Sequence, residues 1–242
     1  MWLGEEILPA VTWLSTMTNF RLTIIKTILD QIFGWSAVIA LSPVFWILAL
    51  MIRLDSPGPV FFRQKRIGKG GQPFVALKFR SMVDKAATMG LGLNVAVDDP
   101  RITRIGRLLR NTSLDELPQL FNVLLGDMSL VGPRPTLPEQ VAAYNPFQRR
   151  RLLVKPGLTG WAQVNGRNAI SWEERIRLDV WYVENWSLRL DFTILLRTIK
   201  TLARQEGLYG PSGINFGFGP AVDPADMASP APRLAQAENL PS

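Results

Sequence analysis

The longest apolar stretch of this chain runs from Ile32 to Ile52, 21 residues without a charged side chain. As a straight helix it is about 30 Å long, which matches the hydrocarbon thickness of a bilayer. Ser42-Pro43 lies at its midpoint, where proline removes the hydrogen bond to the Ile39 carbonyl and bends a helix. The Ser42 hydroxyl can satisfy a carbonyl that the bend frees. The pattern therefore predicts a membrane helix that is broken at Ser42-Pro43.

Basic residues flank the apolar stretch on both sides. They are Arg21 and Lys26 before it, and Arg53 and Arg63-Gln64-Lys65-Arg66 after it. Because positively charged flanks favour the cytoplasmic side of a membrane, we expect residues 28–53 to form a re-entrant helix with both ends on that side. A kinked helix that spans the bilayer is the alternative that these features leave open.

The segments around this helix differ in composition. Residues 1–27 are predicted to be an amphipathic lead-in at the membrane surface, with Trp2, Trp13 and Phe20 as interfacial anchors. Residues 54–209 contain the remaining strand and helix patterns and are predicted to form one domain on the cytosolic face. Residues 210–242 are rich in Pro, Ala, Gly and Ser, which is typical of a disordered tail.

Strand patterns occur early in the predicted domain. Residues 60–62 and 74–79 are apolar runs that flank Gly68-Lys69-Gly70-Gly71, and this arrangement predicts a β-hairpin. Residues 86–100 lack a clear period and are predicted to be a loop.

Helical periodicity follows in three places. The first is a basic strip among apolar neighbours, formed by Arg101, Arg104, Arg107 and Arg110. This pattern suits a helix or 3₁₀ turn at a membrane surface. A solvated basic face is the alternative. Ser171 and Glu174 form a capping-box pattern at a helix start, and residues 188–204 have the apolar face of a core helix. The predicted fold class is therefore α+β: a mostly helical, membrane-associated domain with a re-entrant helix, amphipathic surface helices and a small β-hairpin.

The net charge of +7 is concentrated in one part of the chain. Between Arg53 and Arg110, twelve Lys and Arg stand against four Asp. Such a block indicates a polyanionic partner: nucleic acid, anionic lipid or a nucleotide diphosphate. Eight tryptophans favour the membrane, because indole rings prefer the membrane–water boundary. The chain has no recognised nucleic-acid-binding motif, so we predict no nucleic-acid partner.

The chain has no histidine and no cysteine, which limits its chemistry. Imidazole bases, thiolate nucleophiles and Cys/His zinc sites are excluded. Carboxylates, lysines, arginines, hydroxyls or a hard cation must carry any reaction, and Asp115-Glu116 follows an arginine-rich run. An ionised Asp115 can attack phosphorus, and Glu116 can hold Mg²⁺ against a diphosphate. A solvated helix start without a function is the alternative.

Two local features refine this prediction. Ser113 and Glu116 fit a capping box, but Pro118 favours a helix that begins near Asp115, with both carboxylates at its positive end. Arg134 lies between two prolines, which would hold its guanidinium rigidly for planar recognition of a phosphate.

Several sequence blocks together resemble one family, the bacterial sugar transferases. These are the monotopic polyprenyl-phosphate phosphoglycosyl transferases that initiate exopolysaccharide and O-antigen assembly. The similarity covers about residues 20–205. The blocks are Phe61-Phe62-Arg63-Gln64-Lys65-Arg66-Ile67-Gly68, Lys78-Phe79-Arg80-Ser81-Met82, Thr112-Ser113-Leu114-Asp115-Glu116-Leu117-Pro118-Gln119, Ser129-Leu130-Val131-Gly132-Pro133-Arg134-Pro135, residues 156–167 and the segment around Leu178-Asp179.

The resemblance implies roles for particular residues. Asp115 would be the nucleophile, with Glu116 assisting and both carboxylates contacting Mg²⁺. Asp191 occupies an acidic position of the family and is included in the predicted substrate site. Basic residues in the family motifs would bind the donor diphosphate or the carrier phosphate; they are Lys78, Arg80, Arg110 and Arg134.

The resemblance also implies an activity and a location. The enzyme would transfer a sugar 1-phosphate from a UDP-sugar to undecaprenyl phosphate and release UMP, in two covalent steps at the cytoplasmic face of the bacterial inner membrane. Residues 54–209 would be the catalytic domain. Direct transfer in a ternary complex and a membrane-tethered nucleic-acid-binding module are the rival hypotheses. The motifs discriminate neither among glucose, galactose and N-acetylated hexoses nor among oligomeric states.

Overall fold

The computed structural model describes residues 7–89, 95–96, 98–204, 207 and 214–215. These residues form an α+β fold that is mostly helical, as the sequence predicts. In chain order the elements are α1 (Ile7–Asp55), β1 (Phe61–Ile67), η1 (Lys69–Gly71), β2 (Pro73–Phe79), η2 (Ala86–Thr88), β3 (Val95–Ala96), α2 (Arg104–Thr112), η3 (Leu114–Glu116), α3 (Gln119–Leu125), β4 (Ser129–Val131), α4 (Pro138–Ala142), α5 (Pro146–Arg149), η4 (Arg150–Leu153), β5 (Gly157–Thr159), α6 (Trp161–Val164), α7 (Trp172–Glu184), α8 (Leu188–Arg204) and β6 (Ile214–Asn215).

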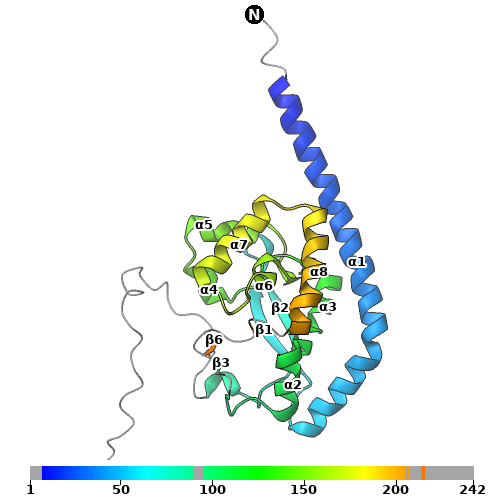
Figure 1. Cartoon of the computed structure of the whole chain (residues 1–242), viewed down its shortest axis with the longest axis vertical. Helices are drawn as coiled ribbons and strands as arrows, with labels where there is room; N and C mark the ends of the chain where they lie inside the picture. The colour runs from blue at the N-terminus through cyan, green and yellow to red at the C-terminus, as the bar shows by residue number, and fades with distance from the viewer. Residues whose placement is uncertain (1–6, 90–94, 97, 205–206, 208–213, 216–242) are drawn as a thin grey trace, which may run out of the picture.

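Figure 1 shows helix α1 lying along one side of a globular body that the other elements form. The described strands make three two-stranded sheets: β1 with β2, β3 with β6, and β4 with β5. The first two pairs are antiparallel and the third is parallel. We refer below to residues 56–204 as the body.

The predicted β-hairpin is confirmed. Strands β1 and β2 pair with Phe61 opposite Phe79 and Ile67 opposite Pro73. Gly70 and Gly71 lie in the turn with φ values of 67° and 80°. Glycine enters this left-handed region without steric cost, so the turn can be tight and the two strands stay in register.

Helix α1 bends part of the way along the body, as Figure 1 shows. The predicted local chemistry is confirmed, because the Ser42 hydroxyl donates to the Ile39 carbonyl at 2.9 Å. That carbonyl is the one that Pro43 leaves without an N–H partner. The helix nevertheless continues from Ile7 to Asp55, so the predicted lead-in and the predicted membrane segment are parts of one helix.

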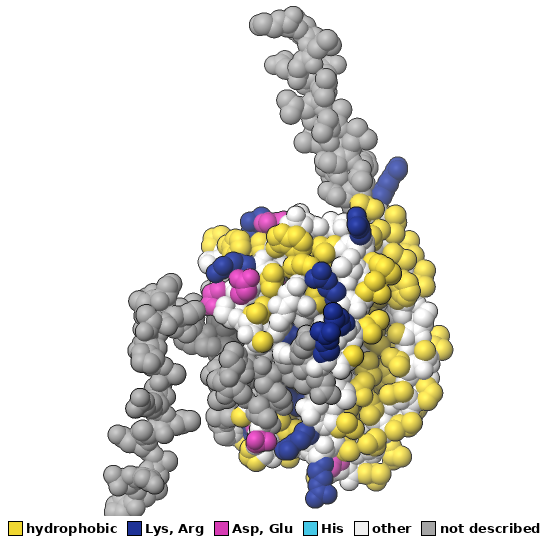
Figure 2. All heavy atoms as spheres, in the orientation of Figure 1, with side chains coloured by type: hydrophobic (Ala, Val, Ile, Leu, Met, Phe, Trp, Pro, Cys, Tyr) yellow, Lys and Arg dark blue, Asp and Glu magenta, His cyan; other side chains and the backbone are white. Residues whose placement is uncertain are grey.

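The outer face of α1 is apolar and exposed. Residues 21–55 are long and apolar enough to cross a membrane, and only 11% of the most apolar window is buried, although length and composition alone are weak evidence. Figure 2 shows the hydrophobic side chains as a broad band on the side of the molecule where α1 lies. Its most exposed large members include Ile32, Phe33, Trp35, Ile39, Trp46, Ile47 and Leu50.

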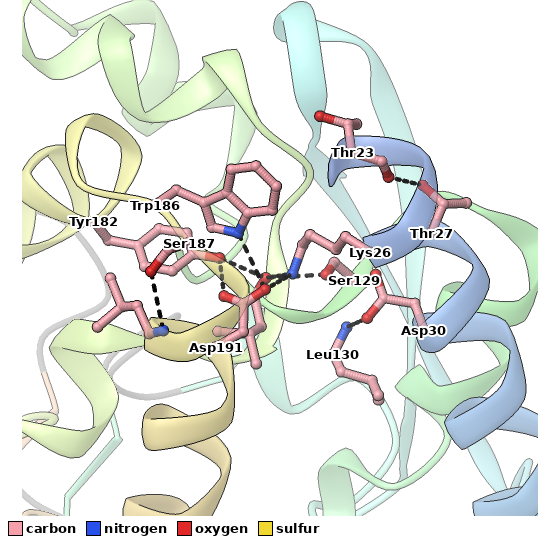
Figure 3. Close-up of polar contacts among 12 residues, drawn as sticks. Thr23, Lys26, Thr27, Asp30, Ser129, Leu130, Tyr182, Trp186, Ser187 and Asp191 are labelled. Carbon is pink, nitrogen blue, oxygen red and sulfur yellow. Dashed lines mark hydrogen bonds and ion pairs between the residues drawn. The ribbon is translucent and has the colours of Figure 1, made fainter. Parts of the chain in front are cut away.

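A polar cluster around Lys26 attaches α1 to the body (Figure 3). Lys26 Nζ donates to Asp191 Oδ2 at 2.5 Å and to the Val131 carbonyl at 3.1 Å. Asp191 also accepts from the Tyr182 hydroxyl at 2.7 Å and from the Trp186 indole at 3.1 Å. Both oxygens of this buried carboxylate therefore have donors. The structure thus gives Asp191 the role of holding α1 against α8, which differs from the predicted role in substrate binding.

Two further residues on the same face of α1 extend this attachment. Asp30 accepts a hydrogen bond from the Leu130 amide at 3.1 Å, and Gln31 donates to the Val123 carbonyl at 2.9 Å. Asp30 lies about one helical turn after Lys26 on the same side of α1, and its neighbour Gln31 also contacts the body. One face of α1 is therefore polar and bonded to the body, while the opposite face is apolar.

The C-terminal part of α1 has a second attachment, which is apolar. Leu48 and Ile52 are buried together with Phe79 of β2 and Leu109 of α2. Asp55 adds a polar contact, because its carboxylate accepts from the Ile105 amide at 3.0 Å. The body therefore holds α1 both before and after the bend.

Arg80 completes the second attachment. Its guanidinium donates to the carbonyls of Ile52, Ser56 and Pro57 at 3.3, 2.6 and 2.8 Å. The last carbonyls of a helix have no intrahelical partner, so a buried cation at this place satisfies them. Arg80 was predicted to bind a phosphate, but here its guanidinium caps α1 instead.

The helices of the body confirm part of the predicted pattern. The Ser171 hydroxyl accepts from the Glu174 amide at the start of α7, and α8 has the predicted bounds. The predicted core face of α8 is wrong in part, because Phe192, Leu196 and Ile199 are more than half exposed. These side chains lie on the same helix as Asp191, which contacts α1, so the apolar surface of the molecule includes α8.

Two further predictions need correction. Arg101 lies before α2 and is not part of a surface strip, because its buried guanidinium pairs with Asp99 at 2.6 Å and binds the carbonyls of Ala86 and Met89. The predicted disordered tail contains the short strand β6, which pairs with β3. The rest of residues 210–242, and residues 90–94 and 97 of the predicted loop, lie outside the described residues.

The Lys26 cluster leads to a stability prediction. Replacing Lys26 with Met leaves the buried Asp191 carboxylate without its cation, and loss of one partner of a buried ion pair costs about 3 kcal/mol. We expect Lys26→Met to lower the melting temperature of the detergent-solubilised protein by several degrees. Arg21→Met removes an exposed cation from the same helix and is the control. Equal melting temperatures for the two variants would contradict the role of this cluster.

Candidate active site

Asp115 and Glu116 lie in the 3₁₀ turn η3, between α2 and α3. Ser113 ends α2 in the left-handed conformation, with φ of 59°. Helix α3 begins at Gln119, directly after Pro118. The prediction that a helix begins near Asp115 is therefore wrong by one turn, because the left-handed residue and the proline isolate a short turn between the two helices.

The Glu116 carboxylate is bound by two cations. Lys78 Nζ lies 2.6 Å from Oε1, and Arg134 reaches Oε1 and Oε2 with two nitrogens at 2.5 and 3.0 Å. Burial raises the pKa of Glu116, but Arg134 and Lys78 outweigh burial and hold it well below its usual range. Glu116 is therefore ionised, and both of its oxygens are occupied.

Asp115 differs from its neighbour. Its half-buried carboxylate makes no hydrogen bond or ion pair with any residue that the structure describes. Burial raises the pKa of Asp115 above the ordinary aspartate value, Lys78 lowers it, and Glu116 raises it again. One carboxylate of the pair is thus neutralised and fixed, and the other has free oxygens close to a lysine and an arginine.

Strand β2 positions Lys78 through a contact with α3. The buried Asn122 side chain accepts from the Leu77 amide at 2.9 Å and donates to the Val75 carbonyl at 2.7 Å. These are the free backbone groups of the β2 edge that does not pair with β1. Asn122 therefore joins β2 to the helix that follows Glu116, and this contact keeps Lys78 opposite the carboxylate. Burial lowers the pKa of Lys78, although Glu116 opposes the shift.

Close backbone contacts position Arg134. A Cβ atom at Gly132 would lie 2.5 Å from the Lys155 carbonyl, and one at Gly157 would lie 2.1 Å from the Gly132 nitrogen. Only glycine permits this approach of β4 to β5. A hydrogen bond also fixes the backbone of the segment after β4, because the Arg151 guanidinium donates to the Arg134 carbonyl at 3.0 Å.

A cavity of about 250 Å³ opens beside Arg134. Its wall contains a single acid, Asp179, which is already paired with Arg151. Burial raises the pKa of Asp179 to about 6, although Arg151 opposes the shift. The cavity is strongly basic, because six arginines contribute to its wall: Arg66, Arg110, Arg134, Arg151, Arg167 and Arg175.

Among the described residues, only Arg134 and Arg151 of these six arginines form ion pairs. Burial and the charge of Arg134 lower the pKa of Arg66 to about 10, although Glu116 and Glu139 oppose the shift. Burial and Arg134 act in the same direction on Arg167 and Arg175. Cations whose charged form is disfavoured in this way gain stability from an anionic ligand.

The structure brings together only some of the predicted site residues. Lys78 and Arg134 contact Glu116 directly, and Arg110 lines the cavity next to Arg134. Arg80 and Asp191 bind α1 instead, as described above.

Sequence reasoning assigned no role to several residues that the structure places at the site. Arg66 and Arg167 stand in motifs that resemble the family, and that position was their only signal. Arg167 also donates to the Ser113 hydroxyl oxygen at 2.9 Å and so supports the turn that carries Asp115. Asn122 has no distinguishing sequence pattern, because its role depends on the edge of a strand 45 residues away.

The carboxylates offer a partial fit to Mg²⁺. The described part of the chain has no group of three or more acidic metal ligands. Mg²⁺ in proteins is often held by one or two carboxylates and by substrate phosphates. Asp115 fits as such a ligand because its oxygens are free, whereas Glu116 would have to open an ion pair.

Comparison with known proteins identifies the family. The profile of the bacterial sugar transferase family matches residues 21–205. The chain belongs to this family. A protein of Bacillus subtilis named uncharacterized sugar transferase EpsL is 49% identical over 185 residues, which are 75% of this chain and 90% of that protein.

Two other relatives carry names that specify a substrate. The undecaprenyl-phosphate galactose phosphotransferase of Salmonella typhimurium is 40% identical over 199 residues. The UDP-glucose:undecaprenyl-phosphate glucose-1-phosphate transferase of Xanthomonas campestris pv. campestris is 43% identical over 196 residues. Each alignment covers 76% of this chain but only 42% and 40% of the relatives, respectively, so the chain spans less than half of their length.

The contact between β2 and α3 can be tested by stability. Asn122→Leu leaves the Leu77 N–H and the Val75 carbonyl buried without partners, at about 1–3 kcal/mol each. We expect the melting temperature of the detergent-solubilised Asn122→Leu variant to be clearly lower than that of the wild type. Asn185→Leu, at an exposed position after α7, is the matched control and should change it little. If the two variants melt alike, Asn122 does not hold β2 on α3.

Proposed function

We propose that this chain transfers a sugar 1-phosphate from a UDP-sugar to undecaprenyl phosphate and releases UMP. The single observation that carries the proposal is the pairing at η3: an Asp115 carboxylate without a partner stands next to a Glu116 carboxylate that two cations neutralise. The names of the relatives supply the substrates, and the family membership supports the reaction class.

The proposed reaction has two steps on Asp115. In the first, a carboxylate oxygen of Asp115 forms a bond to the phosphorus next to the sugar, and the bond from that phosphorus to the UMP oxygen breaks. In the second, a phosphate oxygen of undecaprenyl phosphate attacks the same phosphorus, and the Asp115 carboxylate leaves. The product is undecaprenyl-diphospho-sugar, which serves the assembly of exopolysaccharide or O-antigen-type glycans.

The environment of the two acids supports this division of roles. A nucleophile needs a free oxygen, and Asp115 has one while Glu116 does not. Arg134 lies between Glu116 and the basic cavity, where it can neutralise charge on the transferring phosphate. Lys78 also binds Glu116, and its charge favours the ionised form of Asp115 by opposing the rise in pKa that burial causes.

Mg²⁺ is part of the proposal, with Asp115 and Glu116 as its protein ligands. When bound, the ion would neutralise the diphosphate and stabilise the departing UMP. The unoccupied oxygens of Asp115 favour this ligand role, and the ion pairs of Glu116 limit its share.

We further propose that α1 enters and leaves the bilayer on the cytoplasmic side of the bacterial inner membrane. The Lys26 cluster and the Leu48–Ile52 contact attach α1 to the same body on both sides of the bend. A helix that crossed the membrane completely would carry these two regions to opposite sides. The exposed apolar face of α1 and the basic flanks support the re-entrant arrangement.

The covalent step can be tested with one variant and one adduct. Asp115→Asn keeps the shape of the side chain but removes the anionic nucleophile, so we expect turnover to fall by at least about 10³-fold, roughly 4 kcal/mol in the barrier. Incubation of the wild-type protein with a UDP-sugar and no lipid should release UMP stoichiometrically. Intact-mass and peptide analysis should then find a phosphosugar on Asp115.

Two controls sharpen this test. Asp84→Asn makes the same change at an exposed position of the body and should retain full turnover. Transfer to undecaprenyl phosphate must be measured in parallel with the adduct. Normal turnover without any adduct would replace the covalent mechanism by direct transfer in a ternary complex.

The topology of α1 can be tested by cysteine labelling, because the chain has no natural cysteine. Arg21→Cys and Arg53→Cys flank the apolar stretch, and Asp84→Cys marks the side on which the body lies. In sealed, oriented vesicles we expect an impermeant maleimide to label all three positions from the same side. Labelling of the two flanks from opposite sides would establish a spanning helix instead. Pro43→Ala, which restores the interrupted hydrogen bond, should increase the spanning population.

A further inference from the structure

The basic cavity beside Glu116 contains an unusual concentration of unsatisfied polar atoms. Among the described residues, six buried side-chain nitrogen or oxygen atoms have no hydrogen-bond partner. Five of the six belong to residues of the cavity wall: Gln163 Nε2 and Oε1, Arg167 Nη1, Arg175 Nε and Asp179 Oδ1. Because an unpaired buried polar atom costs about 1–3 kcal/mol, a cluster of them indicates a polar ligand.

The types of these atoms restrict the ligand. The nitrogens of Gln163, Arg167 and Arg175 are donors, and a phosphate could satisfy them. Gln163 Oε1 and ionised Asp179 Oδ1 are acceptors, and a phosphate that carries no proton cannot satisfy those. The ligand must therefore carry N–H or O–H donors as well as hydrogen-bond acceptors. A lipid chain fits neither requirement.

The position and size of the cavity restrict the ligand further. Arg134 belongs both to the cavity wall and to the ion pairs of Glu116, so the phosphate end of a ligand can face Asp115. A volume of about 250 Å³ is below the usual range for pockets that enclose a whole cofactor-sized ligand, which begins near about 300 Å³. The cavity therefore suits one part of a nucleotide-sugar.

We propose that this cavity holds the nucleoside half of the donor and that Gln163 recognises its pyrimidine base. A glutamine amide presents one donor and one acceptor side by side, and uracil presents a carbonyl and an imide N–H in the complementary order. Asp179 and Arg175 then face the ribose hydroxyls, and Arg110, Arg134 and Arg167 face the phosphates. Arginine planes also stack on bases, which suits a wall rich in guanidinium groups. This inference rests on the proposed UDP-sugar donor.

Calorimetric titration of the purified full chain in detergent micelles tests the assignment with four probes: UMP, CMP, inorganic phosphate and glucose 1-phosphate. The wild-type protein should bind UMP more tightly than the other three. Gln163→Leu should weaken UMP binding by about tenfold or more, because two hydrogen bonds to the base are lost, and should leave binding of inorganic phosphate unchanged. Gln72→Leu, in the exposed hairpin turn, is the matched control and should bind UMP as the wild type does.

A second variant tests recognition of the base by the loss of one hydrogen bond. A carboxylate at this position can still accept from the imide N–H of uracil, but it cannot donate to the neighbouring carbonyl and its charge repels that oxygen. Gln163→Glu should therefore bind UMP more weakly than the wild type. The melting temperature of each variant monitors folding.

Each of the remaining outcomes shows whether the assignment of the cavity, the role of Gln163 or the donor class fails. Tighter binding of glucose 1-phosphate than of UMP by the wild type assigns the cavity to the sugar and overturns the inference. Equal UMP affinity of Gln163→Leu and wild type, or an equal loss of UMP and phosphate binding, removes Gln163 from base recognition. If the wild type does not bind UMP at all, the donor class of the proposed function fails as well. Intact UMP binding with an unaffected Gln163→Leu variant leaves the proposed function in place.

Discussion

Lys78 of β2 and Arg134 of the segment that follows β4 reach the same carboxylate, Glu116, and the two strands do not pair with each other. The Lys78 and Glu116 side chains are largely removed from water, which is costly, and close geometry must repay that cost. The elements around the site therefore need fixed positions. Asn122 fastens β2 to α3, and the glycine contacts between β4 and β5 set the place of Arg134. The ion pairs of Glu116 depend on both arrangements and link them.

The neutralisation of Glu116 has a consequence for Asp115. Two adjacent carboxylates repel each other, and the pKa of Asp115 is raised in part for this reason, after burial. The two cations bind Glu116, which leaves the oxygens of Asp115 without partners. The same surplus of cations continues into the cavity, where Arg66, Arg167 and Arg175 make no ion pair with a residue that the structure describes. The body thus places the Asp115 carboxylate close to a wall of basic side chains, which is the arrangement that the proposed reaction needs.

Helix α1 relates this site to a membrane surface. One face of the helix is bonded to the body through Lys26, Asp30 and Gln31, and the opposite face is apolar. The bend at Pro43 allows Leu48 and Ile52 to return to the body. In the proposed reaction a soluble donor and a lipid-linked acceptor use one site in turn. In the proposed arrangement, the two attachments of α1 to the body would hold the site at the membrane surface, within reach of the acceptor phosphate.

Local chemistry along the chain was sufficient to predict the β-hairpin, the helices α7 and α8, the Ser42 contact in the bend and the Asp115-Glu116 pair. Periodicity, capping and proline geometry act over a few residues, so sequence alone determines them. Which side chains meet depends on long-range packing. Arg80 and Asp191 look like substrate ligands in sequence, but they bind α1 because its ends fold back onto the body. The contacts of Asn122 and Arg167 and the place of Gln163 in the cavity wall likewise depend on residues distant in the chain, and only the tertiary structure decided them.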